Sequence, residues 1–135
     1  MKKSLIGLMT IALVGSMSLS SCGKYEEGPG ISLKSPTSRI ATTWEVEKYI
    51  DADGTETAGD DNDPTITYTK DGEFTVTQGN TNYSGTWEFS GDVDLRTETT
   101  IFGFTTVSTV EILRLSSKEL WTKDDDGDVI HFKVK

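Results

Sequence analysis

Polar and apolar residues alternate with a period of two after Pro36, and this pattern restricts the fold more than any other feature of the chain. Between residues 82 and 90, Tyr83, Trp87 and Phe89 alternate with polar neighbours. The same alternation recurs at 64–70, 73–78 and 128–134. A strand turns successive side chains to opposite faces, so this pattern is typical of antiparallel strands with one buried face.

Turn-forming residues separate these segments: Lys70-Asp71-Gly72, Gly79-Asn80, Gly91-Asp92 and Asp126-Gly127. Gly after Asp suits tight hairpins. We expect eight strands, near residues 43–50, 64–70, 73–78, 82–90, 93–101, 105–115, 119–123 and 128–134, and a short helical turn over Ser35 to Ala41. No βαβ spacing is present. Eight hairpin-linked strands avoid exposed edges by closing on themselves, so the sequence predicts an all-β, antiparallel, up-and-down barrel.

One predicted strand changes phase within its length. Val110 and Ile112 share one face of the segment 105–115, whereas Leu113 and Leu115 share the other. A β-bulge at this point would bring both pairs to the interior and bend the strand. We therefore expect a bulge there that helps the barrel to close.

The first 22 residues have the layout of an export signal. Lys2 and Lys3 precede an apolar run over 5–17, which is shorter than the ~20 residues of a membrane-spanning helix. The run ends in Leu19-Ser20-Ser21-Cys22, which looks like a bacterial lipobox. We expect a signal peptide over 1–21, a lipid-anchored Cys22 with a Gly- and Pro-containing tether over 22–36, and the barrel domain over 37–135. An ordinary secretory signal with a chance cysteine is the alternative.

Charge and cysteine content exclude several functions. The chain carries 13 Lys and Arg against 22 Asp and Glu, a formal charge of −9. Removal of 1–21 takes Lys2 and Lys3 away and leaves 114 residues with a charge of −11. Nucleic-acid binding requires clustered basic residues, which this acidic chain lacks. A single Cys cannot form an intramolecular disulfide, and one Cys with one His cannot provide four zinc ligands.

An ordered set of segments resembles a known family. The set comprises Gly28-Pro29-Gly30-Ile31-Ser32-Leu33, Trp44-Glu45-Val46-Glu47-Lys48, Asp53-Gly54, Lys70-Asp71-Gly72-Glu73-Phe74, Gly85-Thr86-Trp87-Glu88-Phe89, Glu111 to Trp121, and Phe132. Over residues 24–135 the chain is similar to the lipocalin-like domain of small Bacteroidetes lipoproteins. The resemblance implies an eight-stranded up-and-down barrel on a lipid anchor in the outer membrane, on its periplasmic or cell-surface face. It implies no catalytic residues and no cofactor.

The residues that could act in catalysis or metal binding have structural explanations. His131 is the single histidine, and its neighbours Ile130 and Phe132 take the inward phase, so we expect an exposed, outward His131 without a catalytic role. Asp124 to Asp128 fails the EF-hand spacing at both ends, which favours a solvated turn over a metal site. Asp60 to Asp63 is expected in a loop that could cover the barrel mouth.

Aromatic residues give the sharper binding hypothesis. Five of them share the inward phase and two more flank a hairpin turn: Tyr68, Phe74, Tyr83, Trp87, Phe89, Phe102 and Phe104. They would either line an apolar cup for a small ligand or simply fill the interior, because an eight-stranded barrel is just wide enough for either. The sequence therefore predicts a non-enzymatic, membrane-anchored binder of a small apolar molecule. The alternative is a packed barrel that contacts an envelope protein partner through its surface.

Overall fold

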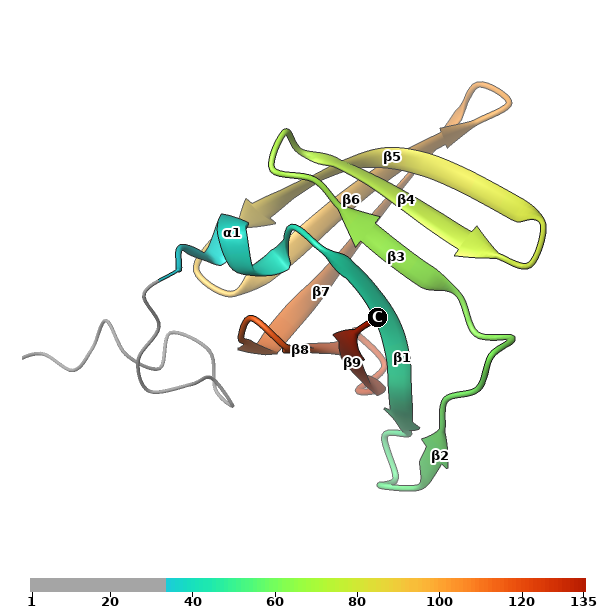
Figure 1. The fold of residues 1–135 in the computed structure, drawn as a ribbon, viewed down its shortest axis with the longest axis vertical. Helices are drawn as coiled ribbons and strands as arrows, with labels where there is room; N and C mark the ends of the chain where they lie inside the picture. Colours follow the sequence, from blue (N-terminus) through green and yellow to red (C-terminus); the bar gives the residue numbers. More distant parts are fainter. Residues whose placement is uncertain (1–33) are drawn as a thin grey trace, which may run out of the picture.

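Nine strands and one short helix form the computed structural model, which describes residues 34–135 (Figure 1). In chain order they are α1 (Pro36–Ile40), β1 (Thr43–Ile50), β2 (Glu56–Ala58), β3 (Thr65–Tyr68), β4 (Glu73–Gln78), β5 (Thr81–Ser90), β6 (Asp94–Ile101), β7 (Phe104–Leu115), β8 (Glu119–Lys123) and β9 (Val129–Val134). The eight expected strands and the helical turn are confirmed. The expected signal peptide and Cys22 lie outside the described residues.

The strands form one closed antiparallel barrel. From β3 to β9 each strand pairs with the next along the chain, and β1 pairs with both β3 and β9, which closes the ring. Eight strands therefore make the barrel, as the sequence predicts. The ninth, β2, pairs only with the end of β1, at Lys48 to Ile50. Among the described residues, no helix is both long and apolar enough to cross a bilayer.

The predicted bulge is present in β7. Its register with β8 shifts between Ile112 and Arg114, so Leu113 is the extra residue. Ile112 and Leu115 both become fully buried, although they belong to opposite phases of the sequence. A second shift, between Val46 and Lys48 in β1, has no such apolar signal and was not expected.

Helix α1 closes one end of the barrel. Ser35 caps it by accepting a hydrogen bond from the Ser38 N–H at 3.2 Å, and the helix buries Ile40 completely. The indole Nε1 of buried Trp44 donates to the Ile40 carbonyl at 2.9 Å, and Arg39 donates to the Leu115 carbonyl at 2.7 Å. The core gathers against this end, and its fully buried members are Ile40, Trp44, Leu95, Ile112, Leu115 and Leu120.

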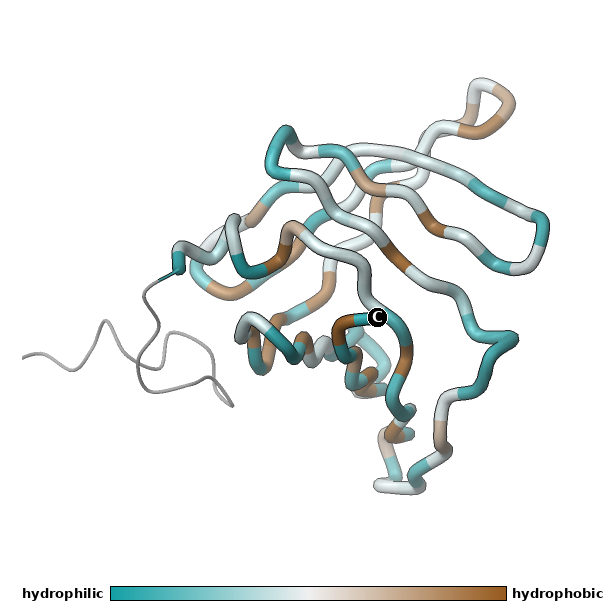
Figure 2. Tube along the Cα trace, viewed as in Figure 1, coloured by the Kyte–Doolittle hydropathy of each residue, from teal (hydrophilic) through white to brown (hydrophobic). Residues whose placement is uncertain are grey.

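A hairpin of β6 and β7 projects at the other end of the barrel (Figure 1). Its turn is Phe102-Gly103, with φ angles of 51° and 79°. Two consecutive positive φ angles are those of the type I′ turn, whose twist matches that of the flanking strands. The tip stands out as an apolar segment in Figure 2. Because Leu115 lies at the α1 end of β7, the tip and α1 mark opposite ends of the molecule.

Candidate ligand-binding site

A cavity of about 390 Å³ occupies the inner face of strands β3 to β7. Its walls are Ile66, Tyr68, Phe74, Val76, Tyr83, Thr97, Thr99, Ile101, Thr106 and Ser108. The volume lies in the range of small-molecule sites, and the walls combine apolar side chains with a few hydroxyl groups, as such sites usually do. This half of the barrel therefore holds an open pocket beside core residues, whereas the α1 end is fully packed.

The cavity opens toward the β6–β7 hairpin. Tyr83 is 42% exposed and Ile101 is 47% exposed, although both line the cavity wall. Tyr68 and Phe74 form the deeper wall and are buried. Of the seven aromatic residues that the sequence singled out, Tyr68, Phe74 and Tyr83 thus contact the cavity.

Trp87 and Phe89 do not line the cavity: Trp87 lies in the core, and Phe89 is partly buried against it. The Trp87 ring meets Tyr68 edge-on at 5.8 Å and Phe89 edge-on at 5.2 Å, measured between ring centroids. Its indole Nε1 donates to the Thr69 carbonyl at 2.9 Å. These edge-to-face contacts fix the ring of Tyr68, so Trp87 and Phe89 support the cavity wall from behind.

Phe102 and Phe104 do not line the cavity either. They are 95% and 79% exposed at the hairpin tip, beyond the mouth. Phe104 pairs with Ile101 in the β6–β7 ladder, and residues directly opposite each other share one face. Because Ile101 lines the cavity, Phe104 continues the same inner face outward from the mouth.

Four hydroxyl residues of the wall were not predicted: Thr97, Thr99, Thr106 and Ser108. They lie in the parts of β6 and β7 near the hairpin, where the inward phase carries Thr and Ser and so gives no apolar signal. Counting in steps of two from the buried Leu95 places Thr97, Thr99 and Ile101 on the inner face. The inward phase of Leu95 could therefore have identified the two hydroxyl residues of β6 in the wall.

Burial acts on the one ionisable group deep in the wall. Tyr68 lies in the core, and its burial is the main reason that the pKa of its phenol is raised well above the usual value. The phenol therefore stays neutral at physiological pH. None of the ten residues of the wall carries a charge under these conditions.

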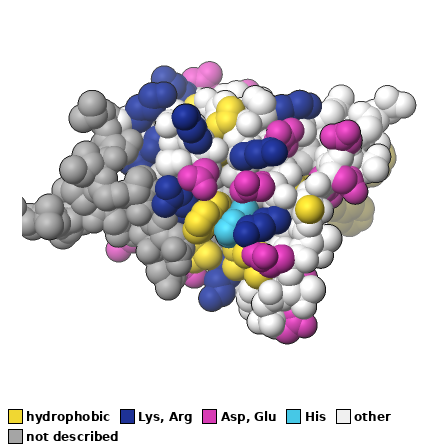
Figure 3. Space-filling model, turned by 60° about the horizontal axis from the view of Figure 1, so that its bottom comes forward, with side chains coloured by type: hydrophobic (Ala, Val, Ile, Leu, Met, Phe, Trp, Pro, Cys, Tyr) yellow, Lys and Arg dark blue, Asp and Glu magenta, His cyan; other side chains and the backbone are white. Residues whose placement is uncertain are grey.

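His131 lies on the outer face, as expected, but the expectation of an exposed ring was wrong. The residue is only 9% exposed, because its ring stacks on that of Trp121, with centroids 3.9 Å apart and an angle of 2° between planes. The guanidinium of Arg114 lies 5.3 Å from the Trp121 ring centroid. Figure 3 shows the histidine among basic and acidic side chains on this face. His131 is therefore a packing residue outside the cavity.

The acidic turn after β8 brings Asp124, Asp126 and Asp128 together, with one ligand oxygen of each within 4.8 Å of the others. All three are exposed, and hydrogen bonds from backbone N–H groups account for the arrangement. Asp124 Oδ1 accepts hydrogen bonds from the N–H groups of Asp126 and Asp128, and Asp128 Oδ1 accepts one from Ala52 N–H. The bond from the Asp126 N–H is that of an Asx turn, and the bond from Ala52 ties this turn to the loop that follows β1.

The second acidic loop, 60–63, is held against β1. Tyr49 donates its hydroxyl to Asp63 Oδ1 at 2.7 Å, and Asp63 Oδ2 accepts from Asp60 N–H. Burial, reinforced by the bond to Asp63, raises the pKa of Tyr49 to about 12. No residue of this loop contacts the cavity, so the structure does not place it over the mouth.

Solved structures with the same fold come from bacteria. A lipocalin-like protein from Bacteroides uniformis has a TM-score of 0.61 and 20% identity, covering 72% of this chain and 99% of its own. An uncharacterized protein from Bacteroides eggerthii has a TM-score of 0.59 and 15% identity, covering 71% and 99%. A protein from Burkholderia xenovorans has a TM-score of 0.51 and 14% identity, covering 78% and 92%.

No family model matches the sequence, and no curated protein does. The comparisons therefore concern the fold alone, which agrees with the ring of eight antiparallel strands. The described residues form a lipocalin-like β-barrel domain.

Proposed function

We propose that this protein is a membrane-anchored, non-enzymatic binder of a small, neutral, apolar molecule. The observation that carries the proposal is the cavity of about 390 Å³ at the open end of the barrel. Fully packed side chains would have left no such space, and an apolar ligand that enters it would remove the exposed apolar wall, including Tyr83 and Ile101, from water.

The walls indicate the chemistry of the ligand. Ile66, Phe74 and Val76 offer apolar contact, while hydroxyl groups such as those of Thr97 and Ser108 can each orient one polar atom. A charged ligand would lose its hydration without gaining a partner, because the wall holds no charged side chain. A largely apolar molecule with one or two neutral polar groups fits best.

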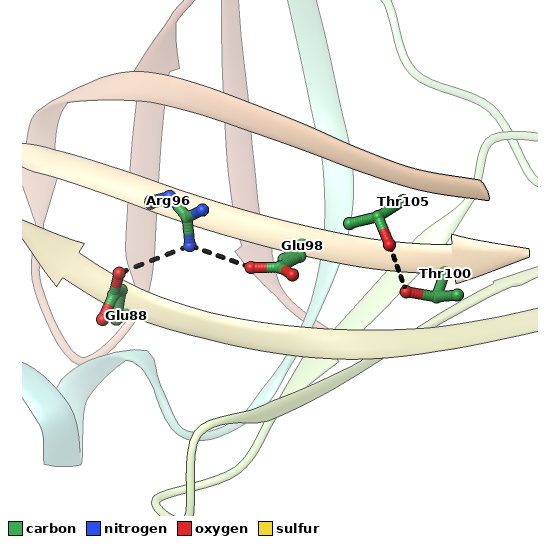
Figure 4. A network of polar contacts seen from close by, with 5 residues as sticks. All are labelled: Glu88, Arg96, Glu98, Thr100 and Thr105. Carbon is green, nitrogen blue, oxygen red and sulfur yellow. Dashed lines mark hydrogen bonds and ion pairs between the residues drawn. The ribbon is translucent and has the colours of Figure 1, made fainter. Parts of the chain in front are cut away.

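Two observations support binding without catalysis. The single histidine is stacked on Trp121 at the outer face, away from the cavity. The Arg96 guanidinium and its partners Glu88 and Glu98 also lie outside, as the close-up in Figure 4 shows. General acid–base chemistry needs a titratable group within reach of the ligand, and the wall offers only the deeply buried phenol of Tyr68 and that of Tyr83.

Blocking the cavity tests the proposal. Thr99 faces the cavity, and Thr100 beside it is exposed on the outer face. We expect the neutral fluorescent probe N-phenyl-1-naphthylamine to bind to the chain from residue 22 onward, with Cys22 replaced by Ser. Thr99→Trp should weaken binding by about tenfold or more, because the indole takes up ligand space, and Thr100→Trp should not. Equal affinities in all three proteins, with intact near-ultraviolet circular dichroism, would sink the proposal.

The anchor is the second part of the proposal. The described chain starts beside α1 at the packed end, and the cavity opens at the other end. A lipid on Cys22 would therefore connect to the barrel at its packed end and leave the mouth free of the tether. A net charge of −11 also repels the body from anionic headgroups, which favours an upright orientation on either membrane face.

Replacing the cysteine tests the anchor. In cells, Cys22→Ser should abolish lipid attachment and leave residues 1–21 uncleaved. The fraction of the protein that partitions with detergent during membrane fractionation should therefore change. A neighbouring Ser21→Ala change is the matched control, because a small residue still precedes the cysteine. Normal processing and lipid labelling of the Cys22→Ser protein would refute lipidation at this residue.

A further inference from the structure

The β6–β7 hairpin carries an open strand edge. β7 pairs with β6 along its length up to Glu111, but its pairing with β8 begins only at Glu111. From Phe104 to Thr109 every residue of β7 is exposed. Within the described part of the chain, this edge of β7 has no partner strand.

The hydrogen-bonding direction of this edge follows from a single contact. The Ile112 N–H donates across the ladder to the Val93 carbonyl at 2.7 Å. Backbone groups alternate in direction along a strand, so the N–H and C=O of Thr105, Val107 and Thr109 face away from β6. Three residues therefore present a regular set of donors and acceptors at the open edge.

The edge is also free of charge. No Asp, Glu, Lys or Arg lies between Thr99 and Val110, in a chain in which 26% of the residues are charged. The last charged cluster on β6 is Arg96 with Glu98, and beyond it the Thr100 and Thr105 hydroxyls bond to each other at 2.9 Å (Figure 4). Natural edge strands usually carry a charge or a proline that discourages pairing, and this one has neither.

Phe102, Phe104 and Val107 are half or more exposed, so two kinds of apolar surroundings could receive the hairpin. A bilayer would cover the phenyl rings but would offer no partners to the backbone groups of the open edge. An unpaired backbone N–H or C=O group is strongly unfavourable in hydrocarbon. A protein strand satisfies both the rings and the backbone. The open edge thus favours strand pairing.

We propose that the partner is a second copy of this chain, paired antiparallel through β7 about a twofold axis at Val107. In this register Val107 faces Val107, Thr105 faces Thr109 and Thr106 faces Ser108 of the second copy. Phe104 faces Val110, where the pairing between copies ends, because Glu111 already pairs with Lys123 of β8. No two charged residues are therefore opposed. The edge is complementary to itself, as a twofold interface requires.

The second copy would also complete the ligand site. Residues directly opposite in an antiparallel pair share a face, and Thr106 and Ser108 line the cavity. Ser108, Thr106 and Phe104 of the second copy would therefore continue the cavity wall past β7. This part of the inference rests on the proposed function, whereas the dimer itself does not.

Two variants of Val107 test the dimer by sedimentation equilibrium, on the chain from residue 22 onward with Cys22 replaced by Ser. Val107→Pro removes the central donor without removing a bond to β6, and Val107→Lys places two like charges face to face. We expect twice the chain mass for the parent protein and weakening of the dimer by about tenfold or more in both variants. Val134→Lys, at a 37% exposed site outside the hairpin, should leave the dimer intact.

Three results would overturn the inference. The first is a single-chain mass for the parent protein up to its solubility limit. The second is a dimer that both Val107 variants leave unchanged while their circular dichroism stays native. The third is flotation with phosphatidylcholine vesicles that Phe102→Ser abolishes and Val107→Pro does not. A monomeric parent protein that binds the probe would overturn the dimer but not the proposed function. A dimer that binds no probe would overturn the proposed function but not the dimer.

Discussion

At the scale of single residues, His131 shows what alternation can and cannot predict. The inward phase of Phe132 correctly places His131 on the outer face of the barrel. Its burial depends on Trp121, which β8 places directly opposite across the ladder. A neighbour on another strand is not visible in a single segment of sequence. The orientation of a side chain was therefore predictable here, but its exposure was not.

This burial makes the stability of the fold sensitive to pH. Loss of hydration is the largest cause that lowers the pKa of His131, followed by nearby Lys48, while Glu47, Glu119 and Glu56 act in the opposite direction. A lowered folded-state pKa means that the unfolded chain binds the proton more tightly than the folded chain does. The contribution of neutral His131 to stability is therefore complete above the unfolded pKa of about 6.5, and it is lost as the pH falls through the folded-state pKa.

His131→Phe keeps a ring against Trp121 but removes this titration. We expect the unfolding free energy of the parent protein, measured in urea, to fall relative to that of His131→Phe as pH drops below about 6.5. Above that pH the difference between the two proteins should be constant. Parallel curves across the whole range would show that burial does not perturb the histidine.

At the scale of elements, strands with a strong apolar face were the predictable ones. The bulge in β7 was visible because two pairs of large apolar residues, Val110 with Ile112 and Leu113 with Leu115, change phase between them. The short strand β2 was missed because all three of its residues are exposed and no buried face marks them. It exists through pairing with β1, which is a long-range contact.

Strand β5 depends on a glycine where it passes between its neighbours. A Cβ at Gly85 would overlap the backbone carbonyl of Glu98 in β6 and lie 2.8 Å from Cε1 of Phe74 in β4. We expect Gly85→Ala to destabilise the barrel by about 1–3 kcal/mol, since the strand must move to relieve the overlap. Ser84→Ala, at the exposed neighbouring position, should change the unfolding free energy little. Similar urea midpoints for the two variants would contradict this view of β5.

At the scale of the whole molecule, the sequence predicted the closed barrel but not which end would be hollow. The aromatic residues share one phase, and Tyr68, Phe74 and Trp87 all belong to the core, yet only Tyr68, Phe74 and Tyr83 also line the cavity. The difference arises because α1 and the large residues of β7 and β8 fill only the end near Leu115. The phase of a residue within its strand decides whether its side chain faces the inside or the outside of the barrel. The height of that side chain along the barrel axis depends on the register of all eight strands.

Native mass spectrometry of the purified chain from residue 22 onward, with Cys22 replaced by Ser, tests the central claim most directly. We predict that a neutral apolar molecule co-purifies, or that N-phenyl-1-naphthylamine binds, with one molecule for each barrel. The Thr99→Trp protein should lose this adduct, and the Thr100→Trp protein should keep it. A folded parent protein that carries no adduct and takes up no probe would contradict the claim that the cavity at the open end of the barrel is a ligand site.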